Sequence, residues 1–63
     1  MTQKELSYIE DAIGHEQNII AIGEYSIELL EDKELKTFIE NELEIHKETL
    51  NNLMNKLEGV ANE

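Results

Sequence analysis

In the first half of the chain, apolar residues recur at alternating intervals of three and four, the spacing of one face of an α-helix. This first stripe, which a carboxylate and a glycine interrupt, consists of Leu6, Ile9, Ile13, Glu16, Ile20, Gly23, Ile27 and Leu30. A second stripe beside it consists of Tyr8, Ala12, His15, Ile19, Ile22, Ser26 and Leu29. Together they make an apolar face wider than the seam of a two-stranded coiled coil.

The pattern changes phase in the second half. Continuing the first stripe would place only polar residues on it, namely Glu34, Thr37, Asn41, Glu44, Glu48 and Asn51. The apolar positions are instead Ile39, Leu43, His46, Leu50, Leu53, Leu57 and Val60, flanked by Leu35, Phe38, Glu42 and Ile45. Their centre is rotated by more than about 100° from that of the first half. The chain should therefore fold back as an antiparallel two-helix hairpin.

Capping residues place the ends of the helices. Residues 1–63 form one unit with helices at about 3–31 and 33–58, joined by a turn at about 31–33. Thr2 and Glu5 have the spacing of a capping box for the first helix. Asp32 suits the N-cap of the second helix, and Gly59 suits the residue just past its end. Gly23 either admits a bulky neighbour such as Phe38 or allows a close approach of the helices.

The chain is too small to be stabilised well by a single core, so it needs a partner. It has 63 residues and no cysteine, which removes both disulfides and thiolate metal sites. A hairpin also leaves the second stripe exposed to water, whereas two hairpins would close a four-helix bundle. We expect at least a homodimer, with an interface formed by Ile19, Ile22, Leu29, Phe38 and Ile45.

The charge balance restricts the partners. Fifteen acidic residues against five basic ones give a net charge of −10, which disfavours nucleic acid and anionic membrane. The longest apolar run, Ile19 to Ile22, is far shorter than a membrane span. The N-terminus has no secretion signal pattern. We expect a cytoplasmic protein that is not secreted.

Ionisable residues interrupt both stripes, and each needs a partner if it is buried. In an antiparallel hairpin, His46 lies within side-chain reach of Glu16, and Glu42 lies one helical turn from His46. One interpretation is a hydrogen-bonded Glu16–His46 pair that fixes the register, with His15 at the flank. The other is a metal site of Glu16, His46, Glu42 and His15, which a dimer would double and which suits iron, manganese or zinc.

The stretch Glu34-Leu35-Lys36 with Phe38 and Ile39, leading to His46 and Leu50 and preceded by Glu16-Gln17 and Tyr25, resembles the ferritin-like helical hairpins of coat F-type spore-coat proteins. The resemblance covers about residues 8–57 and implies an all-α, ferritin-like bundle and, as an alternative to a purely cytoplasmic location, association with the spore. It also implies that Glu16 matches a first-helix carboxylate ligand and His46 a second-helix histidine ligand. Leu43 stands where the Glu-x-x-His pattern has its glutamate, which argues against iron oxidation.

These observations favour a non-catalytic structural or assembly protein without a cofactor, acting as a homodimer or larger homo-oligomer and, by the resemblance, with coat proteins as partners. The alternative is a small ferritin-like protein that binds metal or oxidises iron at a site formed on dimerisation. A third reading is a regulator whose hairpin exchanges into a bundle with another protein.

Overall fold

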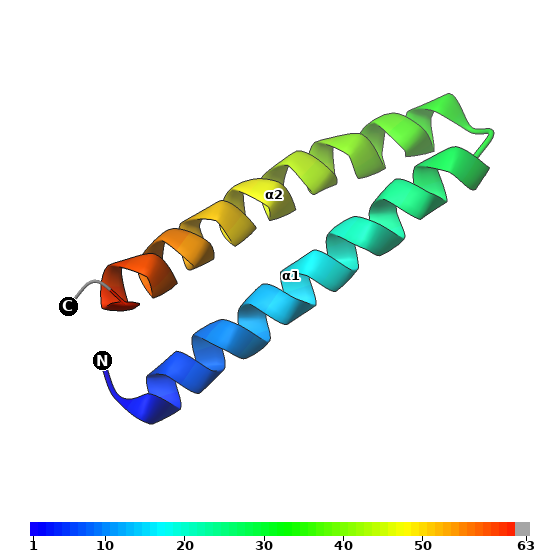
Figure 1. Ribbon diagram of the computed structural model, residues 1–63. Helices are drawn as coiled ribbons and strands as arrows, with labels where there is room; N and C mark the ends of the chain where they lie inside the picture. The colour runs from blue at the N-terminus through cyan, green and yellow to red at the C-terminus, as the bar shows by residue number, and fades with distance from the viewer. Residues whose placement is uncertain (62–63) are drawn as a thin grey trace.

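The protein is a helical hairpin. The computed structural model describes residues 1–61 and contains two helices, α1 (Gln3–Leu29) and α2 (Lys33–Ala61). The helices lie side by side and antiparallel, so that the start of α1 and the end of α2 lie at one end of the rod and the turn at the other (Figure 1). The rod measures 47 × 14 × 12 Å. The predicted all-helical hairpin is thereby confirmed.

The start of α1 is held by the predicted capping box. The Glu5 backbone N–H donates to Thr2 Oγ1 at 3.1 Å, and the Thr2 backbone N–H donates to Glu5 Oε1 at 2.9 Å. These bonds satisfy donors that have no partner within the helix. The bond from the Thr2 backbone lowers the pKa of the Glu5 carboxyl, because it stabilises the ionised form.

The turn is short, and α1 ends at Leu29, two residues before its predicted end at about 31. Leu30 already has extended backbone angles, although its N–H still donates to the Ser26 carbonyl at 3.0 Å. Asp32 is the N-cap that the sequence predicts for α2, since its Oδ1 accepts from the Leu35 backbone N–H at 3.0 Å. Residues 30–32 are thus the whole connection between α1 and α2.

The predicted end of α2 at Gly59 is wrong. The helix continues through Gly59 to Ala61, and among the described residues no glycine has a positive φ. The reason lies in Val60, which continues the apolar stripe of α2 and is partly covered by the packing of the helices. Burial of that side chain favours one more helical turn over a glycine stop.

The helices meet along a narrow strip, which we call the seam. The seam follows the first stripe from Leu6 on α1 to Leu30, just past the end of α1, and on α2 it follows the stripe from Ile39 to Val60. Ile20 and Leu43 are its most buried residues, at 9% and 5% exposure. All other seam residues are only partly covered, so the hairpin has little core of its own.

Leu43 packs into the space that Gly23 leaves open. A Cβ at position 23 would collide with Leu43 Cδ2 and would lie 3.1 Å from its Cγ. The sequence predicts that Gly23 either admits a bulky neighbour such as Phe38 or allows a close approach of the helices. The bulky neighbour is Leu43 and not Phe38, which is 61% exposed. The missing side chain lets α1 and α2 approach closely at this level.

The helices are long, with 27 and 29 residues. Charged residues nevertheless recur throughout both of them, and within residues 1–61 neither helix offers an apolar stretch long enough to cross a membrane.

Candidate functional site

A carboxylate and an imidazole meet inside the seam. His46 Nδ1 lies 2.6 Å from Glu16 Oε2, which is a short, charge-assisted hydrogen bond. An ionised carboxylate can only accept, so the tautomer of His46 that pairs with an ionised Glu16 is the one with its proton on Nδ1. The side chains are 17% and 30% exposed for Glu16 and His46 respectively. This contact is the one that the antiparallel register predicts.

The pair borders the best-packed part of the seam. Glu16 lies one helical turn before Ile20, and His46 lies one turn after Leu43. The polar pair is therefore adjacent to the two buried apolar side chains. A shift of either helix by one turn would leave the carboxylate and the imidazole facing apolar residues. The pair therefore favours the observed register over its neighbours.

The other two proposed ligands lie elsewhere. His15 and Glu42 are both exposed, outside the seam, and the structure gives neither of them a contact to the Glu16–His46 pair. Within residues 1–61, no group of three or more His, Asp or Glu side chains is arranged to hold a metal ion. One chain thus brings together Glu16 and His46 from the predicted set, and these two side chains supply one oxygen and one nitrogen.

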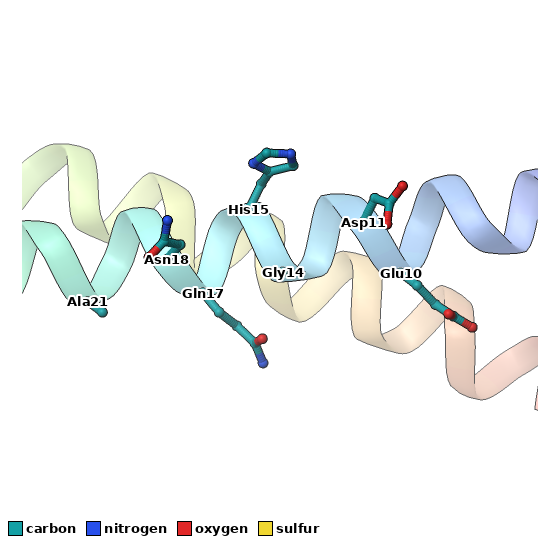
Figure 2. A pocket seen from close by; sticks show the side chains of 7 residues that line it. All are labelled: Glu10, Asp11, Gly14, His15, Gln17, Asn18 and Ala21. Carbon is teal, nitrogen blue, oxygen red and sulfur yellow. The ribbon is translucent and has the colours of Figure 1, made fainter.

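His15 instead borders a shallow depression over Gly14. Its lining comes entirely from α1, between Glu10 and Ala21. In Figure 2, His15 and Asp11 project to one side of the helix and Gln17 to the other. Because the polar groups diverge and no second element covers them, they do not converge on a common ligand.

The second notable feature is a broad apolar surface outside the seam, which we call the open face. Its large side chains are between 40% and 65% exposed. They are Tyr8, Ile19, Ile22 and Leu29 on α1 and Leu35, Phe38 and Ile45 on α2. All five residues predicted for a dimer interface are among them.

An ion pair shows that the two apolar flanks lie on the same side of the hairpin. Lys47 Nζ lies 3.8 Å from Glu24 Oε1, across one edge of the seam. Each of these residues follows a seam residue by one position, whereas the apolar flank residues other than Leu35 precede seam residues by one. Leu35 precedes Lys36, which lies one turn before Ile39 on the same stripe. At about 100° per residue, the flanks of both helices therefore lie along the opposite edge, next to each other.

The Glu24–Lys47 pair was not foreseen from the sequence. The signal was present, because each residue follows the adjacent seam residue, Gly23 or His46, by one position. Both partners are at least half exposed, so the pair marks the edge of the seam more than it stabilises the fold.

Comparison of the chain with protein-family models, with curated proteins and with solved structures finds no match. The polar pair and the open face are the features on which a function can be based.

Proposed function

We propose that this protein is a non-catalytic structural or assembly protein that acts as a homodimer, in which two hairpins close a four-helix bundle through their open faces. The observation that carries the proposal is the open face itself. Large apolar side chains gathered on one side of a soluble monomer typically mark an interaction surface. The partner is a second copy of the chain, for two reasons that concern area and charge.

The exposed area matches what a dimer would cover. The chain exposes 5056 Å², whereas a compact monomer of 7.3 kDa exposes about 4,200 Å². The excess is comparable to the roughly 800 Å² that each partner contributes to a standard interface. A second hairpin would also supply the core that the seam alone lacks.

The open face is also suited to a second copy by its charge. The fully charged side chains at positions that precede seam residues are Glu5, Glu42 and Lys56, which leave a balance of −1, although the chain carries a net charge of −10. Two copies can therefore meet here without bringing acidic surfaces together. The resemblance to coat F-type proteins supports spore-coat partners for such an assembly, and we include that role in the proposal.

Sedimentation analysis at micromolar concentration tests the dimer. We expect the wild-type chain to have the mass of two copies. Ile22→Glu should give a monomer of reduced helix content, since it places a charge on the open face. Tyr25→Glu is the matched control, because Tyr25 is 64% exposed and lies on the side of α1 opposite the seam.

A wild-type chain that sediments as a helical monomer would overturn the proposal. Equal loss of association in Ile22→Glu and Tyr25→Glu would overturn the assignment of the open face as the interface.

A second candidate function, metal binding at a site completed by dimerisation, is supported by the Glu16–His46 pair. One hard oxygen and one imidazole nitrogen suit iron, manganese or zinc, and twofold symmetry would bring a second such pair. Calorimetric titration of manganese or zinc into the apoprotein tests this function. Binding that Glu16→Gln abolishes would favour it, and the absence of binding would exclude it for these metals.

A further inference from the structure

The open face has two unlike halves. Towards the turn, the residues at its positions are apolar apart from Ser26 and Glu42, and they include Ile22, Leu29 and Leu35. Towards the chain ends, α2 contributes the polar Thr49, Asn52 and Lys56, and α1 contributes His15, Ala12 and Tyr8. The boundary lies at the level of Ile19 and Ile45, about midway along the rod.

We propose that the two hairpins pack with their turns at the same end of the bundle, so that each α1 lies antiparallel to α2 of the second copy. This inference rests on the proposed dimer and adds its orientation. The twofold axis then runs along the bundle. Both turns emerge at one end, and all four chain ends emerge at the other.

Matching along the helices favours this orientation. Within the hairpin, residues at one level have numbers that sum to between about 62 and 66, as the contacts of Glu16 with His46 and of Gly23 with Leu43 define. The same-end orientation repeats this relation between copies. Ile19 then faces the partner's Ile45, and Leu29 faces the partner's Leu35.

The polar halves also match. At the same sum, His15 faces the partner's Thr49 and Tyr8 faces the partner's Lys56, whose aliphatic stem can cover the ring. Tyr8, Ile19, Leu29, Leu35 and Ile45 are then covered by apolar or amphipathic side chains of the partner. Two large apolar side chains meet polar ones, because Ile22 lies at the level of the partner's Glu42 and Phe38 at the level of the partner's Ser26.

The opposite orientation fits less well. With turns at opposite ends and full overlap, α2 residues whose numbers sum to about 94 would face each other, so Phe38 would lie over the partner's Lys56 and Ile45 over the partner's Thr49. Sliding the hairpins until only the turn halves overlap restores the apolar contacts. It leaves the other halves overhanging, with Tyr8 exposed and about half of the length unused.

Spin-label distances decide between these arrangements. The chain has no cysteine, so Ser7→Cys, Ala21→Cys and Glu28→Cys each provide one label per copy. The three positions are exposed and separated by whole heptads, so they lie on the same side of α1. In the same-end orientation, the distance between copies should be the same at all three.

In either opposite orientation, the three distances cannot agree. A step of seven residues moves each label by about 10 Å, in opposite directions in the two copies, so the axial separation changes by about 21 Å per heptad. Circular dichroism and sedimentation of each labelled variant verify its fold and its mass. Asp11, Asn18 and Tyr25 are exposed and offer a second set of equally spaced positions if a variant fails to fold.

Three equal distances would support the same-end orientation. Distances that differ among the three positions, as axial shifts of this size require, would overturn the orientation and leave the proposed dimer intact. No distance between copies at any label, in a chain that sediments as a monomer, would overturn both.

Discussion

At the scale of single residues, the hairpin depends on two kinds of contact in the seam, one apolar and one polar. Gly23 and Leu43 make the closest approach of the helices, and Leu43 is the most buried side chain. One layer away, Glu16 and His46 satisfy each other. Leu43 occupies the position at which the Glu-x-x-His pattern has a glutamate, so the residue that departs from the ligand pattern is also the one that fills the core.

The two glycines of α1 should respond in opposite ways to alanine. Gly14→Ala should raise the free energy of unfolding by about 1 kcal/mol, since a Cβ there meets nothing within 4 Å and alanine favours the helix. Gly23→Ala should instead lower the free energy of unfolding, because overpacking against Leu43 costs about 1–3 kcal/mol and outweighs the gain in helix propensity. Urea denaturation of both variants at one protein concentration measures the difference. Equal stabilisation of both would contradict the packing of Leu43 on Gly23.

At the scale of the elements, the ends of the helices are set by local hydrogen bonds. The capping box of α1 joins residues three positions apart, and so does the N-cap of α2. Such bonds depend on neighbours in the sequence and form in the same way whatever packs against the helix. The end of α2 is different, because Val60 in the seam extends the helix past Gly59.

Removing the N-cap of α2 should destabilise the hairpin. Asp32→Ala deletes the acceptor of the Leu35 backbone N–H and should lower the free energy of unfolding by about 1 kcal/mol. Asp32→Asn keeps an acceptor oxygen and should retain most of the stability. Glu31→Ala is the matched control, an exposed acidic neighbour to which the structure gives no capping bond. A loss in Glu31→Ala as large as that in Asp32→Ala would point to charge as the cause.

At the scale of the whole molecule, exposed area and charge act against each other. The rod has a radius of gyration of 14.5 Å, compared with about 11 Å for a compact chain of this length, and its apolar side chains lie open along one side. Association through the open face would cover them. Each copy nevertheless carries a net charge of −10, so two copies repel each other at a distance.

Salt should therefore tighten the proposed dimer. The screening length falls from about 30 Å at 0.01 M salt to about 10 Å at 0.1 M, which removes most of the repulsion between the outer acidic surfaces. We expect the dissociation constant from sedimentation equilibrium to fall several-fold over this range. Sodium chloride and potassium fluoride should act alike, since screening depends on ionic strength. A dissociation constant that rises with salt would instead indicate ion pairs across the interface.

Much of the fold could be predicted from the sequence, and less of the site. The stripes identified the seam residue by residue, and the register brought Glu16 to His46. The Glu24–Lys47 pair and the occupant of the space beside Gly23 were missed. They depend on which side chains meet across the helices, and helical periodicity gives a residue's direction but not its neighbour on the facing helix.

The sequence by itself determined the two helices, their antiparallel arrangement and the caps at Thr2 and Asp32, because these follow from a period of 3.6 residues and from bonds between near neighbours. Only the tertiary structure decided that Leu43 packs on Gly23, and that His15 and Glu42 lie apart from the polar pair. It also joined the two apolar flanks into one open face, since the distance between helices and their rotation about their axes result from packing.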